Sequence, residues 1–200
     1  MIVTGIEAVT KKKYKVELDG QLAFVLYKGE LARYCLDLDK ELKKEQYDEI
    51  MNKVLKRAKQ YLLHLLTKMD RTEYELETKL RRAYYPDEII EQAIAYVKSY
   101  GYVDDESYAR RYLQNYEGRL SFRQIKWKLS SKGIPKNILE ELTEMRTNHD
   151  ESELVEAYIQ KKIKGKSQLD EKELKKVADF LYRKGIENTD IWDALKKYRK

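Results

Sequence analysis

The chain has 200 residues, with 41 lysines and arginines against 35 aspartates and glutamates, so its formal net charge is +6 at pH 7. Charged residues make up 38% and apolar residues 42% of the chain, which favours several small cores in an elongated arrangement over one thick globule. No segment approaches the roughly 18 consecutive apolar residues of a membrane span, and no basic-then-apolar signal peptide is recognisable. We therefore expect a cytoplasmic protein with no membrane contact.

The residue counts also limit the possible chemistry. Cys35 is alone, which excludes an intramolecular disulfide and a multi-thiolate zinc site, and only His64 and His149 could contribute imidazole. His64 lies among leucines and is interpreted as a core or rim residue. The acidic run 104–106 is interpreted as a helix start rather than a metal site, because negative charge is favourable at a helix N-terminus. With no phosphate loop or nucleophile motif, we expect no enzyme activity, catalytic residue, cofactor or metal.

The N-terminal segment differs from the rest of the chain. Apolar residues alternate with polar ones near 13–18 and 21–27, on either side of Asp19-Gly20, and this pattern predicts a two-stranded β-hairpin. Residues 2–9 are expected to add a third strand. Beyond this module, only two prolines and eight glycines in the whole chain indicate that most of it is helical.

Three helix starts recur at a fixed interval. A long amphipathic helix is predicted from Glu45 to Met69, and Thr72, Ser121 and Asp170 then follow at intervals of 49 residues. Each is followed three positions later by glutamate or glutamine, the pattern of a capping box. In the third case the matching positions slip by three residues, which predicts a helix nearly one turn longer.

The helix ends recur as well. Gly133 and Gly185 stand where a helix ends in the left-handed conformation, and an isoleucine follows each of them, as in a Schellman motif. The first repeat has Tyr84 at this place. Ala58, Ala109 and Ala157 are expected to occupy comparable points of the three opening helices.

These signals predict a mainly α protein with three tandem three-helix repeats, preceded by a small β-hairpin or sheet module. The expected parts are an N-terminal module (1–44), a long helix with the first repeat (45–103), a second repeat (104–149) and a third repeat (150–200). No part is large enough to fold well alone, so neighbouring repeats are expected to stack into an elongated, monomeric array.

Positive charge is concentrated in the middle repeat. Seven cations and only one acid, Glu117, fall within 23 residues, and these cations are the candidate filament- or DNA-binding residues: Arg110, Arg111, Arg119, Arg123, Lys126, Lys128 and Lys132. Tyr108, Tyr112 and Tyr116 follow at helical spacing and are interpreted mainly as a packed face, and Trp127 lies among the cations. We favour a contact with phosphates or acidic protein over a merely solvated face.

A helix-turn-helix interpretation must also be considered. Residues 121–132, the turn at 133–135 and residues 136–146 have suitable lengths. However, the would-be recognition helix carries Glu140, Glu141 and Glu144, and its counterpart in the first repeat is also acidic. Phosphates would repel both helices.

Several stretches of the sequence resemble a known family, among them Thr72 to Leu80, with Leu129 and Leu181 at repeated places. Gly101-Tyr102-Val103-Asp104-Asp105-Glu106 followed by Tyr108-Ala109, and Ser121 through Lys132-Gly133-Ile134-Pro135, are similar to the bacterial RecX regulators of the RecA recombinase. The resemblance covers most of the chain. It implies a curved array of three repeats that lies in the groove of a RecA–DNA filament and usually restrains strand exchange, with no catalytic residues. The implied partners are the RecA filament and single- or double-stranded DNA.

Two alternatives remain open from the sequence. One is a nucleic-acid-binding architectural or transcriptional protein with helix-turn-helix-like units that acts without RecA. The other is an accessory subunit of an enzyme, whose repeats bind only protein. Steep salt dependence of DNA binding would distinguish a phosphate-binding protein from one that binds protein alone.

Overall fold

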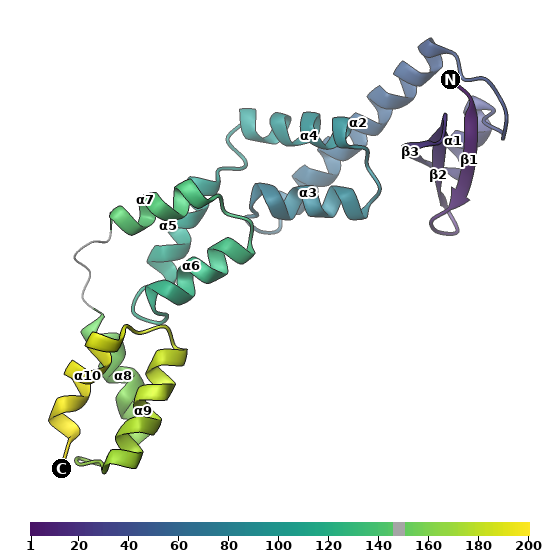
Figure 1. The fold of residues 1–200 in the computed structure, drawn as a ribbon. Coiled ribbons are helices and arrows are strands. Elements are labelled where there is room, and N and C mark those ends of the chain that lie inside the picture. The colour runs from purple at the N-terminus through teal and green to yellow at the C-terminus, as the bar shows by residue number, and fades with distance from the viewer. Residues whose placement is uncertain (146–150) are drawn as a thin grey trace. The chain divides into compact units, whose positions relative to one another are not determined.

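The computed structural model describes residues 1–145 and 151–200, and these form a small sheet followed by helices (Figure 1). The chain divides into two compact units, residues 1–104 and 105–200. Among the described residues, no helix combines the length and the apolar character needed to span a bilayer.

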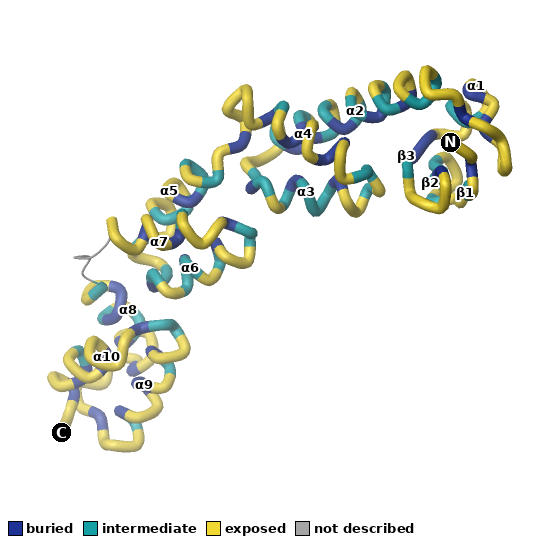
Figure 2. The backbone as a smooth tube through the Cα atoms, turned by 45° about the horizontal axis from the view of Figure 1, so that its top comes forward, coloured by how far each residue is buried: buried dark blue, intermediate teal, exposed yellow. Residues whose placement is uncertain are grey.

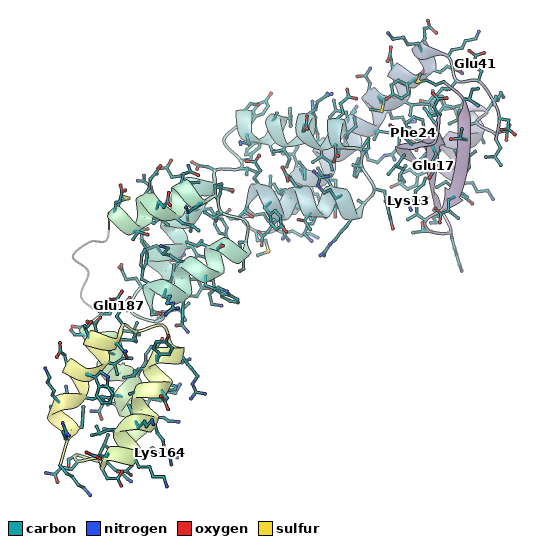
Figure 3. All side chains as sticks on the ribbon, in the orientation of Figure 1. Lys13, Glu17, Phe24, Glu41, Lys164 and Glu187 are labelled. Atoms are coloured by element: carbon teal, nitrogen blue, oxygen red, sulfur yellow. The ribbon has the colours of Figure 1, made fainter. Side chains whose placement is uncertain are left out.

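The N-terminal sheet confirms the predicted hairpin and the third strand. Its antiparallel strands are β1 (Val3–Ala8), β2 (Lys13–Leu18) and β3 (Gln21–Tyr27), in that order. Asp19 and Gly20 both have positive φ, 49° and 82°, as a type I′ turn requires. Phe24 of β3, labelled in Figure 3, is fully buried.

A short helix, α1 (Lys28–Tyr34), lies within the segment that the sequence predicted only as a β module. It is held by the carboxylate of Glu30, which accepts from the Tyr27 N–H at 2.8 Å and from the Arg57 guanidinium at 2.6 and 2.7 Å. Arg57 also donates to the Val25 carbonyl of β3 at 3.1 Å. Burial raises the pKa of Glu30, but the Tyr27 N–H and Arg57 outweigh it and hold that pKa below its usual value.

Helices α2 (Lys44–Leu66), α3 (Glu73–Arg82) and α4 (Asp87–Ser99) complete the first unit. The predicted apolar face of α2 is buried, and its side chains share one hydrophobic core with the sheet and with α3 and α4. The sheet module and the first three helices share this core within one compact unit, residues 1–104. The four-part division of the chain stays a prediction.

The second unit contains two further groups of three helices, each around its own core. In Figure 2 the buried segments of each group turn toward the other helices of that group. The first group comprises α5 (Asp105–Tyr116), α6 (Phe122–Ser131) and α7 (Lys136–Glu144); Arg146, the expected end of α7, lies outside the described residues. The second group comprises α8 (Ser152–Ile163), α9 (Glu171–Arg183) and α10 (Asn188–Leu195), followed by the 3₁₀ turn Lys196–Tyr198.

All three predicted capping boxes are confirmed. The side chains of Thr72, Ser121 and Asp170 accept from the backbone N–H three residues on, at 3.2, 3.2 and 2.8 Å. In each case the side chain of that third residue accepts from the N–H of the cap. Helix α9 has 13 residues against 10 in α6, so the predicted extra turn is present.

The expected equivalence of the three alanines is wrong for the third repeat. Ala58 and Ala109 are fully buried, but Ala157 is exposed. In α8 the core positions are taken instead by Val155 and Ile159, because the helix presents a different face to its neighbours.

The helix ends follow the predicted Schellman pattern. Gly133 has φ 80°, and the Ile134 N–H donates to the Leu129 carbonyl at 3.1 Å. Gly185 has φ 84° and is followed by the same bond at 3.2 Å between Ile186 and Leu181. Each stop fixes the direction in which the chain leaves the second helix of its repeat.

The third group has a polar network that links α8 to the end of the chain. The Glu156 carboxylate accepts from the Tyr198 hydroxyl and from the Gln160 amide, and it lies 2.6 Å from the Lys197 ammonium. These bonds from Gln160, Lys197 and Tyr198 lower the pKa of Glu156 to about 2. Charge on Glu156 therefore stabilises the folded third repeat.

We expect Tyr84→Gly to give a more stable protein than Tyr84→Ala, by about 1 kcal/mol, because a side chain at positive φ is strained. Tyr84 has φ 62°, at the place where the later repeats have glycine. Both variants lose the contact of the Tyr84 ring with the Lys15 ammonium, which lies 4.2 Å from the ring centre. Urea unfolding measures the difference, and equal stabilities would contradict the strain.

We expect Tyr198→Phe to destabilise the protein by about 1 kcal/mol at pH 7, because it removes a hydrogen bond to a charged carboxylate. The pKa of Glu156 is depressed in the folded state, so its contribution is present above the ordinary value of 4.5 and is lost as the pH falls toward about 2. The gap between variant and wild type in urea unfolding should shrink over that range. A gap that is unchanged at acid pH would argue against this role of Glu156.

Candidate functional site

The seven cations proposed as a contact surface come from two neighbouring helices and the turns that flank them. Arg110 and Arg111 lie on α5, Arg119 lies in the turn after it, and the other four lie on α6 or at its end: Arg123, Lys126, Lys128 and Lys132. The arginines are exposed and the lysines are half-buried. The arginines are thus more accessible to a partner.

The half-buried lysines leave α6 in different directions. The Lys126 ammonium donates to Thr143 Oγ1 on α7 at 3.0 Å. The Lys132 ammonium instead lies 5.6 Å from the centre of the Tyr108 ring on α5. Lys128 follows Lys126 by two positions, which turns it by about 200° around the helix. The seven cations therefore do not share one face of the repeat.

Arg123 and Trp127 form the outward row of α6. They are four positions apart and so lie on the same side of the helix, while Ile125 and Leu129 on the opposite side are fully buried. Trp127 is 70% exposed, more than any other large hydrophobic residue in the described chain. An exposed cation and an exposed flat ring therefore occur together on this side of α6, as the sequence predicts.

The tyrosine stripe of α5 is mostly a packed face. Tyr108 and Tyr112 are half-buried against the core of the repeat, with ring centres 6.3 Å apart, and this confirms the packing interpretation for both. Burial raises the pKa of the Tyr112 hydroxyl, followed by the effect of Tyr116 beside it. Tyr116, 4.5 Å away between ring centres, is exposed. The stripe therefore leaves only its last ring accessible.

Hydrogen bonds between described residues join the second and third groups of helices. The Ser121 hydroxyl donates to the Lys184 carbonyl at 2.5 Å, in addition to its capping bond. The Phe122 N–H donates to Glu151 Oε1 at 2.8 Å. The Tyr158 hydroxyl donates to the carbonyl of residue 119 at 2.9 Å. The end of α9 is thereby held against the start of α6.

This junction brings two residues to the site that the sequence analysis missed. Tyr182 and Arg183, at the end of α9, line a cavity of about 350 Å³ together with Arg123 and Trp127. They are about 55 residues beyond Trp127 in the sequence. Only the repeat register could have indicated Tyr182 and Arg183. They come shortly before Gly185, which ends α9 in the same way as Gly133 ends α6.

The described residues that were considered for metal or acid–base chemistry do not form a site. Asp105 and Glu106 lie in the first turn of α5, in agreement with the helix-start interpretation. His64 is exposed on α2, and His149 lies outside the described residues. Among residues 1–145 and 151–200, no group of three or more histidines, cysteines, aspartates and glutamates could hold a metal ion.

The acidic helices that argued against helix-turn-helix recognition keep their charge at the surface. Glu140, Glu141 and Glu144 of α7 are exposed. A helix presenting these carboxylates would meet a phosphate backbone at an electrostatic cost. The basic helices α5 and α6 are the better candidates for any contact with nucleic acid.

Two family models match the chain. The model of the first three-helix domain of RecX matches residues 58–96, and that of the third three-helix domain matches residues 149–195. The first range runs from α2 to α4, and the second covers α8 to α10.

Individual proteins match over nearly the whole chain. The "Regulatory protein RecX" of Caldanaerobacter subterraneus subsp. tengcongensis is 31% identical over 199 residues, which cover 98% of each chain. The protein of the same name from Clostridium beijerinckii is 27% identical over 94% of this chain and 91% of its own. A solved structure described as "Crystal structure of regulatory protein RecX" has a similar fold, with a TM-score of 0.66 and 24% identity over 98% of both chains.

We expect Ser121→Ala to destabilise the protein by about 2 kcal/mol, because it removes a helix cap and leaves the Lys184 carbonyl without this donor. Ser131→Ala, at the other end of α6, is the matched control. Its exposed hydroxyl bonds only the Lys128 carbonyl one turn earlier, so we expect a change within about 0.5 kcal/mol. Thermal unfolding measures both, and equal effects would show that neither the cap nor the bond to the Lys184 carbonyl adds to stability.

Proposed function

This chain belongs to the RecX family of regulatory proteins, and on that premise we propose that it regulates a RecA recombinase by binding the RecA–DNA filament and restraining strand exchange. The observation that carries the proposal is the 31% identity to a "Regulatory protein RecX" over 98% of both chains. A match of this extent includes all the repeats, so the relationship is not confined to one three-helix motif that many proteins could share. The proposed role belongs to DNA repair and recombination.

The repeated construction suits a polymeric partner. Several three-helix groups, each with its own surface, can touch successive subunits or nucleotides of a filament. Each contact can be weak, because linking the groups in one chain raises the effective concentration of the next contact. No catalytic step is needed for such a regulator, and we propose none.

The exposed arginines of the middle repeat are the proposed electrostatic part of the contact. Arg110 forms an ion pair with Glu106 one turn earlier, but both side chains are about half exposed, so this pair contributes little to stability. Arg110 is therefore able to exchange this partner for phosphates or acidic side chains at small cost, and Arg111 and Arg123 are exposed as well. Contacts of this kind weaken as the salt concentration rises.

We expect the triple variant Arg110→Glu, Arg111→Glu, Arg123→Glu to bind RecA–single-stranded DNA filaments at least about tenfold more weakly than wild type, because three attractive charges become repulsive. Co-sedimentation and the filament ATPase rate measure the effect. The matched control is Lys172→Glu, Lys175→Glu, Lys176→Glu, which makes the same charge change on exposed positions of α9. Circular dichroism must show that both variants are folded.

Intact co-sedimentation and ATPase modulation in the first variant would mean that the basic cluster is only a solvated surface. Equal losses in both variants would mean that net charge, rather than this cluster, governs binding. If wild type binds DNA but leaves the ATPase rate of the filament unchanged, the protein is a nucleic-acid-binding protein that acts without RecA.

A further inference from the structure

The cavity between α6 and the end of α9 exposes two large aromatic side chains at one place. Trp127 is 70% and Tyr182 is 56% exposed, and both line the cavity. Single exposed apolar side chains are common on protein surfaces, but two aromatic rings that line one concave site form the kind of patch that ligands cover. The volume, about 350 Å³, lies in the range of sites that take a small molecule or one residue of a polymer.

The polar lining of this cavity is cationic. Arg123 and Arg183 contribute guanidinium groups, and no carboxylate is among the described residues that line it. Within the described chain, the Arg123 guanidinium forms no hydrogen bond or ion pair. Another cavity of the same unit, between α8 and α10, is in contrast lined by five carboxylates and one lysine. The cavity between α9 and α10 carries three cations, Lys175, Lys196 and Arg199, but also the carboxylate of Glu171. Among the described lining residues, the site at Arg123 therefore differs from both other cavities in having no carboxylate.

The junction that builds the cavity is tightly packed. Gly185 follows α9 with φ 84°, and a Cβ atom at this position would lie 2.9 Å from Ser121 Oγ and 3.1 Å from Arg123 Cβ. Only glycine permits this approach of the end of α9 to the start of α6. Together with the bond from Ser121 to the Lys184 carbonyl, it holds Tyr182 and Arg183 in position beside Arg123 and Trp127.

We propose that this cavity binds single-stranded DNA, with a base stacked on Trp127 or Tyr182 and the adjoining phosphates held by Arg123 and Arg183. Flat aromatic rings beside cations are the combination that binds unpaired nucleotides, because every base has a face that stacks. In a duplex the bases are already stacked on one another, so a concave aromatic site favours single strands. The inference rests on the proposed function, because it names the residues that would contact the DNA of the filament.

Fluorescence of Trp127 tests the proposal directly, because the chain has only two tryptophans. In the Trp192→Phe variant, Trp127 is the only one left. Trp192 lies in a different cavity, between α9 and α10, so this substitution leaves the proposed site intact. We expect oligothymidylate of about ten nucleotides to quench the fluorescence of Trp192→Phe and to leave that of Trp127→Phe nearly unchanged.

An abasic oligomer with the same number of phosphates separates stacking from charge. We expect wild type to bind it at least about fivefold more weakly than oligothymidylate, and Trp127→Leu to reduce this preference to about one. Arg123→Gln and Arg183→Gln should weaken binding of both oligomers and lower the salt slope by about one each. The matched control, Lys176→Gln on the exposed face of α9, should leave the slope nearly unchanged.

Equal affinity of wild type for the two oligomers, or no quenching of Trp127, would overturn the proposal. It would also be overturned if Trp127→Leu lost filament binding but kept its affinity for oligothymidylate, because the cavity would then bind protein. These titrations contain no RecA, so their failure is distinct from a failure of the proposed function, which filament co-sedimentation tests. Trp127→Leu must keep the thermal stability of wild type, as expected for so exposed a side chain.

Discussion

The helical repeats depend on one kind of polar contact, the side chain that caps the second helix of each group. Thr72 and Ser121 are fully buried, and a buried hydroxyl without partners would cost several kcal/mol. Both hydroxyls avoid this cost by accepting from the N–H three residues on. The start of the helix is therefore fixed to a single residue, and the left-handed stop at its other end fixes its length. The second helix of each group packs against its neighbours between these two ends.

Features that depend on nearby residues could be predicted from the sequence. A capping box, a glycine stop and a type I′ turn each need a few residues at fixed short spacing, and Asp19-Gly20, Ser121 and Gly133 all occur as expected. Tyr84 shows the limit of such rules. It adopts φ 62° without being glycine, because the surrounding repeat holds the backbone there.

Features that depend on distant residues could not be predicted. Helix α1 has a local contact between Glu30 and the Tyr27 N–H, but it also depends on Arg57, which lies 27 residues beyond Glu30. The directions of Lys126 and Lys132 depend on which neighbouring helix each one meets. The sequence therefore shows which cations belong to the cluster, but it does not show that they lie on several faces of the repeat.

The proposed DNA contact of the middle repeat combines attraction with selectivity. Cations attract any polyanion, and those on α5 and α6 point in several directions, so their combined field is broad. Selectivity needs groups held in one geometry, which here requires the junction of α6 with α9. Ser121 serves both purposes, because its hydroxyl starts α6 and also bonds the Lys184 carbonyl. The contact that defines the helix thus also positions the rings and guanidinium groups at its outer face.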